Sequence, residues 1–199
     1  MDLDTVVTNL NKRRFIASRF TSNQALKSAV VDIIGSRSVG ISGSASVHEL
    51  GLYDALVQQG NLVHCHTYCE EKDQARHAAM GADVYLCSAN AIMEDGMILN
   101  IDGTGNRVAA TVFGPKTVIV IAGKNKIAKD VESGIARTRR ESCPKNARRL
   151  GLSTPCALTD TCGDCKTPAR MCNAFMLLAY PTRNVEKFYV LLSDERLGW

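Results

Sequence analysis

Cysteines are concentrated in the last third of this 199-residue chain. Four of them, Cys156, Cys162, Cys165 and Cys172, fall within 17 residues. The two-residue gap between Cys162 and Cys165 lets both thiolates reach one metal ion across a tight turn. Two further thiolates, with Cys143 as an additional candidate, complete a four-cysteine site for zinc or an iron–sulfur cluster. We therefore interpret residues 143–173 as a cysteine-rich segment that binds a metal or a cluster.

The same segment allows interpretations without a metal. Cys162 and Cys165 are spaced as a redox dithiol, and neighbouring arginines favour a thiolate nucleophile. Alternatively, the cysteines are unreactive thiols that stay reduced. A basic stretch precedes them, because residues 137–149 hold six Lys and Arg against one Glu. That stretch is either a solvated helix face or a surface that holds an anion and lowers the pKa of nearby thiols.

A second group of potential ligands ends a predicted strand. It consists of His64, Cys65, His66 and Cys69. Alternate side chains of a strand point to opposite faces, so these four cannot easily converge. Only His66 and Cys69 lie close enough to the carboxyl end of the strand to reach a site there. The alternative is that the two histidines are ordinary core or surface residues.

A small polar loop follows the first strand of the central pattern. Its candidate ligand-binding residues are Ser42, Gly43, Ser44 and Ser46. The amides of such a turn face the N-terminus of the following helix, where anions bind. Ser46 and Glu49 fit a capping box, and Glu49 is also kept as a candidate catalytic acid. The loop is neither a Walker A loop nor a Rossmann fingerprint, so its alternative role is a tight strand-to-helix turn.

Small polar residues are also crowded into the region after residue 81. Asp95-Gly96 between apolar runs predicts a hairpin, and the glycines at 103 and 105 predict a second sharp turn. The hairpin does not account for the remaining polar residues, so a binding rim is predicted. The rim consists of Asn100, Asp102, Gly103, Thr104, Gly105 and Asn106. An elaborate structural loop, with Asn106 capping a helix that ends at residue 112, is the alternative.

These groups need structural elements that bring them together. Short β-branched runs predict strands at 39–41, 62–66, 84–87, 118–121 and 187–193. Helix-like stretches at 47–59 and 70–80 separate the first three strands, which predicts a parallel sheet with crossover helices. Ligands bind beyond the carboxyl ends of such strands. Helical spacing in residues 3–34 predicts two helices, which form an N-terminal helical arm over residues 1–36 of a single α/β domain, 1–199.

Composition excludes several classes of protein. Hydrophobic residues make up 45% of the chain and charged residues 22%, as in folded proteins with a substantial core. The longest apolar run, residues 174–180, is far shorter than the roughly 20 residues that a membrane span requires. No signal peptide is visible, so we expect a cytoplasmic protein without membrane association. The net charge of +4 comes from one local patch, so we expect no nucleic-acid partner.

Several segments, taken in this order, resemble the LUD (lactate-utilisation) family. They are Gly43-Ser44 with residues 49–52, residues 90–92 with Asp95-Gly96 and Asn100, and residues 105–108, 114–116, 120–126 and 194–198. The resemblance implies a doubly wound, mainly parallel α/β sheet of the CoA transferase and sugar-phosphate isomerase type. Residues 81–83, Asp95-Gly96, Asn100 and Gly103-Thr104 also resemble a motif of the aldose-phosphate isomerases. There an acid, matched here by Asp83 or Asp95, handles a proton.

The resemblance implies a role in lactate and pyruvate redox metabolism, as an accessory or electron-transfer subunit with iron–sulfur partner subunits. The cysteine-rich segment departs from the basic subunit of that family. The alternative is a stand-alone isomerase or transferase that acts on a phosphorylated or CoA-linked small molecule. In that case residues 42–46 hold the anion, Asp95 moves a proton and Lys124 neutralises a developing charge. A non-catalytic, ligand-sensing module is the third hypothesis. We expect an anionic small-molecule ligand, whereas the substrate and the oligomeric state stay open.

Overall fold

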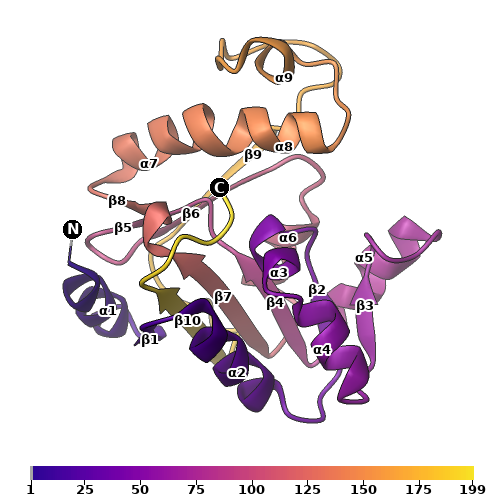
Figure 1. Ribbon diagram of the computed structural model, residues 1–199, viewed down its shortest axis with the longest axis vertical. Coiled ribbons are helices and arrows are strands. Elements are labelled where there is room, and N and C mark those ends of the chain that lie inside the picture. The colour runs from indigo at the N-terminus through magenta and orange to yellow at the C-terminus, as the bar shows by residue number, and fades with distance from the viewer. Residues whose placement is uncertain (1) are drawn as a thin grey trace.

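The computed structural model describes residues 2–199 and shows a central sheet with a smaller layer above it (Figure 1). The central sheet has six strands in the order β1-β10-β7-β4-β2-β3, and each neighbouring pair is parallel. These strands are β1 (Ile16–Phe20), β2 (Val39–Ile41), β3 (Val63–Cys65), β4 (Val84–Ser88), β7 (Thr117–Gly123) and β10 (Lys187–Ser193). The predicted mainly parallel, doubly wound α/β fold is confirmed.

Helices cover both faces of this sheet, which is why its inner strands are apolar on both sides. In β7, Val118 and Val120 belong to one core cluster, whereas Ile119 and Ile121 belong to the cluster on the opposite face. The first cluster includes side chains of α1 (Leu3–Lys12), α5 (Lys72–Met80) and α6 (Asn106–Val112). The second includes side chains of α2 (Asn23–Ile34), α3 (Ala45–Glu49) and α4 (Leu52–Gln58).

The upper layer combines a second sheet with the helices that carry the basic stretch. Its strands, in the order β8-β5-β6-β9, are β5 (Ala91–Met93), β6 (Ile98–Asp102), β8 (Ile127–Ala128) and β9 (Ala174–Leu178). A 3-10 turn (Lys124–Lys126) leads into β8, and a π-helical turn (Thr138–Ser142) joins α7 (Val131–Arg137) to α8 (Cys143–Arg149). The short helix α9 (Pro155–Thr159) lies above α8 (Figure 1). Val131 and Ile135 of α7 pack against the second sheet.

The N-terminal region differs from the predicted pair of helices. After α1, the backbone of Arg14 takes a φ of +67°, and the chain continues as β1, which pairs with β10 at the sheet edge. Phe15 and Ala17 are buried while Ile16 is exposed, which is the alternation of a strand. The predicted arm therefore contributes a strand to the central sheet as well as two helices.

The other predicted elements agree with the structure to within a few residues. The strand predicted at 187–193 has the same bounds as β10, and the hairpin at Asp95-Gly96 joins the antiparallel strands β5 and β6. The single helix predicted over 47–59 is wrong, because Gly51 takes a φ of +58° and divides it into α3 and α4. Across residues 2–199, none of the helices combines the length and the apolar character that a membrane crossing requires.

Candidate functional site

A cavity of about 530 Å³ lies at the carboxyl edge of the central sheet. The strand order reverses there, because the chain passes from β2 outward to β3 and returns on the other side of β2 as β4. This reversal leaves a crevice at the strand ends where α/β proteins bind ligands. Residues 42–46 after β2 and Ser88 at the end of β4 both line the cavity. Asn146 and Arg149 of α8 line it from the upper layer.

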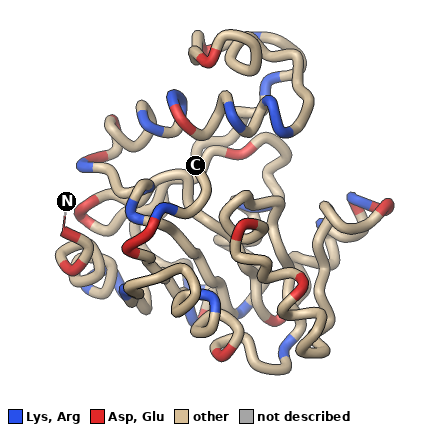
Figure 2. The backbone as a smooth tube through the Cα atoms, viewed as in Figure 1, with Lys and Arg blue, Asp and Glu red and all other residues tan. Residues whose placement is uncertain are grey.

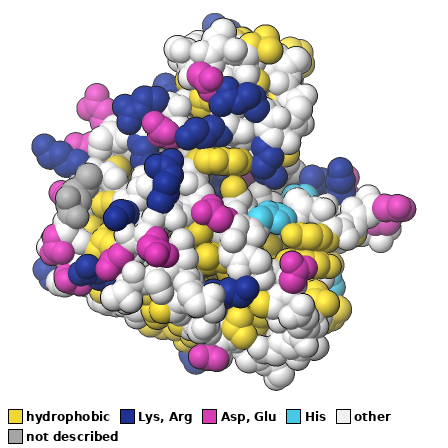
Figure 3. All heavy atoms as spheres, in the orientation of Figure 1, with side chains coloured by type: hydrophobic (Ala, Val, Ile, Leu, Met, Phe, Trp, Pro, Cys, Tyr) yellow, Lys and Arg dark blue, Asp and Glu magenta, His cyan; other side chains and the backbone are white. Residues whose placement is uncertain are grey.

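The cavity wall is strongly cationic. Among the described residues that line the cavity, five have a basic side chain and one, Asp102, has a carboxylate side chain. The five are Arg76, Arg107, Lys126, Arg149 and Arg170. Basic side chains also follow the neighbouring helices α7 and α8, as the blue segments of Figure 2 and the dark blue side chains of Figure 3 show. This excess of positive charge attracts an anion.

Lys126 is a buried lysine in the wall of the cavity. Its side chain is buried, and Nζ donates hydrogen bonds of 2.8 Å to Ser46 Oγ and of 2.8 Å to Ser88 Oγ. The Ser88 hydroxyl in turn donates to the carbonyl of Ile121 over 2.6 Å. A neutral amine has two N–H groups, which the two serines accept. Its lone pair is therefore left for a bound molecule.

Burial has a large effect on the protonation of Lys126. Desolvation is the main cause, and the positive charges of Arg137 and Arg107 act in the same direction, so that the pKa falls to about 7. Lys126 therefore changes its charge close to neutral pH. A group whose pKa lies near the working pH can both accept and return a proton during a reaction.

Two polar atoms of the cavity have no hydrogen-bond partner within the described part of the chain. These are Ser42 Oγ and Arg76 Nε, both buried. A buried donor without a partner costs about 1–3 kcal/mol, which a ligand or a water can recover. Beside Ser42, Gly43 lets the loop approach His66 closely, because a Cβ there would lie 3.0 Å from His66 Nε2.

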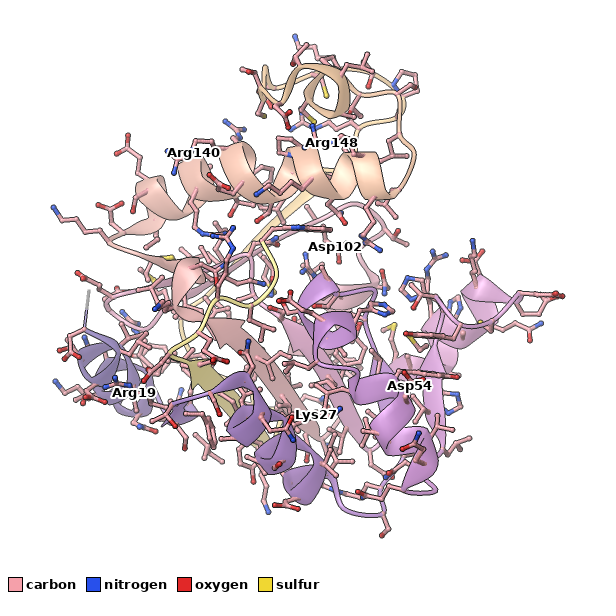
Figure 4. All side chains as sticks on the ribbon, in the orientation of Figure 1. Arg19, Lys27, Asp54, Asp102, Arg140 and Arg148 are labelled. Atoms are coloured by element: carbon pink, nitrogen blue, oxygen red, sulfur yellow. The ribbon has the colours of Figure 1, made fainter. Side chains whose placement is uncertain are left out.

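The polar residues of the predicted rim mainly hold the loop between β6 and α6. Asp102, labelled in Figure 4, accepts backbone N–H groups at the start of α6, including that of Arg107 over 3.0 Å. The Asn100 side chain accepts the backbone N–H of Asn90 over 3.2 Å. Arg107 donates to the Asn90 side chain over 2.9 Å and to the Ile101 carbonyl over 2.6 Å. These contacts fix the position of the Arg107 guanidinium.

The structure divides the predicted ligand-binding residues into two sets. Those that line the cavity are Ser42, Gly43, Ser44, Ser46, Asp102, Gly103, Thr104 and Asn106. Asn100, Gly105 and Lys124 lie outside its lining. Lys124 is exposed, and the buried lysine of the site stands two positions later. Gly105 takes a φ of +91° in the turn before α6, so its role is conformational.

The three candidate catalytic acids do not line the cavity. Asp83 stands before β4, at the opposite edge of the sheet, and accepts the Ser38 hydroxyl over 2.6 Å. Asp95 lies in the β5–β6 turn, where it forms an ion pair with Arg13 over 2.8 Å. Glu49 accepts the backbone N–H of Gly198 over 2.8 Å. All three are engaged in contacts that hold the fold together.

The predicted capping box is also wrong. The helix begins one residue earlier, at Ala45, so Ser44 occupies the N-cap position without a side-chain capping bond. The Ser46 hydroxyl instead accepts the amine of Lys126. Glu49 reaches the C-terminal tail, which packs between α3 and the upper layer. Trp199, the last residue of that tail, lines the cavity, and its ring centroid lies 5.8 Å from the Arg149 guanidinium carbon.

The cysteines form two groups around α8. Cys156, Cys162, Cys165 and Cys172 line a small second cavity. Nowhere in residues 2–199 do three His, Cys, Asp or Glu side chains gather so that they could hold a metal ion. The zinc ion or iron–sulfur cluster that the sequence predicts in residues 143–173 stays a prediction. Cys143 and Cys172 do meet, with Sγ atoms 3.4 Å apart, and both line the main cavity.

The sequence analysis did not select the residues that give the cavity its positive charge and its buried amine. Lys126 lies in the segment 120–126 that resembles the LUD family, but it was not selected as a site residue. Ser88 carried no motif, and Arg149 was noted only as part of a basic stretch. Arg149 is held over the loop after β2, because it donates to the Gly43 carbonyl over 3.2 Å. In the second histidine group, His66 does line the cavity, whereas Cys69 is exposed. The position of Ser88 at the end of a predicted strand was the available signal.

One solved structure and one family model match this chain over nearly its whole length. A crystal structure of a DUF162 family protein from Deinococcus radiodurans has a similar fold, with a TM-score of 0.59 and 14% identity over 96% of each chain. The eIF2B delta protein from Chaetomium thermophilum gives a TM-score of 0.34 and 19% identity, over 66% of this chain and 50% of that one. None of the curated proteins matches the chain. The model of the LUD domain matches residues 3–193, nearly the whole sequence, and the chain therefore belongs to the LUD domain family.

Proposed function

We propose that this protein binds a small organic acid by its carboxylate or phosphate group and that Lys126 transfers a proton at the bound molecule. The LUD domain family is related to lactate utilisation, which makes a 2-hydroxy or 2-oxo acid the first class of ligand to test. The observation that carries the proposal is the buried Lys126 amine, held by Ser46 and Ser88 in a cationic cavity.

Anion recognition rests on groups from both layers. Arg149 reaches from α8 and Arg76 from α5, while the loop after β2 adds the unpartnered hydroxyl of Ser42. Guanidinium groups bind carboxylates and phosphates with paired, charge-assisted hydrogen bonds. A ligand anion between these groups lies within the cavity that Lys126 also lines. The amine can therefore act on an atom next to the anionic group.

Lys126 replaces the acids that the sequence favoured for proton transfer. In its neutral form the amine accepts a proton from a carbon or an oxygen of the ligand. In its charged form a third N–H becomes available, which stabilises a developing negative charge. The buried amine in a cationic cavity supports the isomerase or transferase hypothesis.

The first experiment is calorimetric titration with lactate, pyruvate, inorganic phosphate, a sugar phosphate and a CoA ester. Lys126→Met is expected to weaken binding of the preferred anion by about 10–100-fold, because a hydrogen bond to a charged group contributes about 1.5–3 kcal/mol. Lys124→Met removes an exposed lysine two positions away and is the matched control. If none of the five anions binds the wild-type protein, or if both variants bind alike, the proposal is wrong.

A second measurement separates proton transfer from binding. The preferred ligand is incubated with the protein in deuterium oxide, and nuclear magnetic resonance follows exchange of the C–H bond beside its carbonyl or hydroxyl group. Wild-type protein is expected to speed this exchange, whereas Lys126→Met binds weakly and does not exchange even at saturating ligand. Tight binding without exchange in the wild type supports the ligand-sensing hypothesis and contradicts the assigned role of Lys126.

A further inference from the structure

Cys143 and Cys172 form a close pair of thiols on the cavity wall, and the proposed function does not use it. Cys143 begins α8, and Cys172 lies two positions before β9, 29 residues further along the chain. Their Sγ atoms are 3.4 Å apart. Because a disulfide bond is about 2.0 Å long, the two atoms need to approach by only about 1.4 Å to form one. Rotation of the two side chains supplies such a movement.

The two thiols differ in access and in chemical character. Cys143 is buried, whereas Cys172 is half-buried. The Sγ atoms of Cys172 and Cys143 share a hydrogen bond. That bond is the main cause that lowers the pKa of the Cys172 thiol, and the charges of Arg170 and Arg139 act in the same direction. The same bond and burial raise the pKa of Cys143. A half-buried thiol with a lowered pKa beside a buried thiol is the arrangement of an attacking and a resolving cysteine.

We propose that Cys172 and Cys143 are a redox-active dithiol that reduces a small anionic disulfide in the cavity. The Cys172 thiolate attacks one sulfur of the disulfide, forms a mixed disulfide and releases the first thiolate, which takes a proton from solvent. Cys143 loses its proton to solvent and attacks the Cys172 sulfur, and the second thiolate leaves and is protonated. The two cysteines lose two electrons, and the disulfide becomes two thiols. This activity does not depend on the organic acid.

The arginines of the cavity are the reason why we expect the disulfide substrate to carry negative charge. Arg170 donates to the Cys172 carbonyl over 3.0 Å and forms an ion pair with Asp164 over 2.8 Å, and its charge favours the Cys172 thiolate. Arg149 reaches the same cavity from α8, the helix that Cys143 begins. The sequence analysis gave a dithiol of Cys162 and Cys165 as an alternative to a metal site. Among the described residues, the hydrogen bond between two thiols joins Cys172 and Cys143 instead.

Peptide mapping of the whole chain tests the pair directly. The reduced protein is treated with oxidised glutathione, quenched with N-ethylmaleimide, digested with trypsin and analysed by mass spectrometry. The expected product links peptide 141–145, which holds Cys143, to peptide 171–183, which holds Cys172. The other three cysteines of the segment share peptide 150–166. Oxidation confined to that peptide, or no oxidation of Cys172, overturns the proposal.

Variants separate the two roles. Cys143→Ser is expected to accumulate a glutathione adduct on Cys172, and Cys143→Ala repeats the test with a side chain that leaves no hydroxyl buried. Cys172→Ser forms neither adduct nor link, whereas the double variant Cys162→Ser and Cys165→Ser keeps the link. The wild type reacts faster with anionic oxidised glutathione than with cationic cystamine, and the reverse order contradicts the role of the arginines. Stoichiometric zinc or iron that protects Cys172 until a chelator is added also overturns the proposal.

Discussion

Replacing the buried lysine by Lys126→Met should change how the stability of the protein depends on pH. The pKa of Lys126 falls from 10.5 to about 7 on folding. Between these two values the unfolded chain holds a proton that the folded chain has released. Unfolding therefore takes up a proton, and raising the pH stabilises the folded wild type over this range. The variant has no such group, so its own stability lacks this contribution.

The size of the effect follows from the shift. Since one pKa unit corresponds to about 1.4 kcal/mol, the free energy of unfolding of the wild type should rise by about 2 kcal/mol relative to Lys126→Met between pH 7 and pH 9. Below pH 6 both states of the wild-type protein hold the proton, and the difference between wild type and variant becomes constant. Thiols and tyrosines that titrate in the same range are present in both proteins and cancel in the comparison.

Urea unfolding followed by circular dichroism at pH 6, 7, 8 and 9 measures this difference. Lys124→Met should parallel the wild type, because its lysine is exposed. The preferred anion should reduce the pH dependence of the wild type, because a bound anion favours the charged amine and raises the pKa of Lys126. Parallel curves for wild type and Lys126→Met from pH 7 to pH 9 would refute the assignment of a neutral, buried amine.

Three further predictions concern residues around the site and the fold. Arg149→Ala should weaken anion binding about 10-fold, whereas calorimetry of Arg148→Ala should show a change under about twofold, because that arginine faces away from the cavity. Gly40→Ala should lower the free energy of unfolding by about 1–3 kcal/mol, since its Cβ would lie 2.2 Å from a backbone carbonyl oxygen of α5, and Gly163→Ala is the unhindered control. Asp95→Asn should cost at most about 1 kcal/mol of stability and leave anion affinity unchanged, because its ion pair is exposed.

The sheet could be predicted from the sequence because its strands are short apolar runs separated by helical stretches. In a parallel sheet these runs are buried on both faces, so local hydrophobicity alone identifies them. The strand β1 was not predicted, because its five residues follow α1 closely and Ala17 also fits the helical spacing of that segment. The pairing of β1 with β10 joins residues far apart in sequence, and no local pattern encodes it.

The candidate site could be predicted only in part, because a residue type does not show the direction of its side chain. Lys124 and Lys126 occupy one 3-10 turn, in which successive side chains point in directions about 120° apart. A shift of two residues along the chain therefore separates a lysine that faces solvent from one that faces the cavity. Asp83 is a clear acid beside a predicted strand, but it stands at the amino end, away from the edge where ligands bind. The hairpin signal at Asp95-Gly96 was correct, and its turn forms an ion pair with Arg13, the residue that follows α1.

The positive charge of the cavity affects both the stability of the folded protein and its affinity for an anion. The folded protein holds four arginines and a lysine around one hollow, and their mutual repulsion is reduced when Lys126 is neutral. An anion that enters the hollow offsets the repulsion and favours the return of the proton to the amine. Binding should therefore take up a proton near neutral pH, in proportion to the fraction of neutral Lys126 in the free protein. Titration in two buffers of different ionisation enthalpy measures that uptake, and an anion that binds without it does not reach the amine.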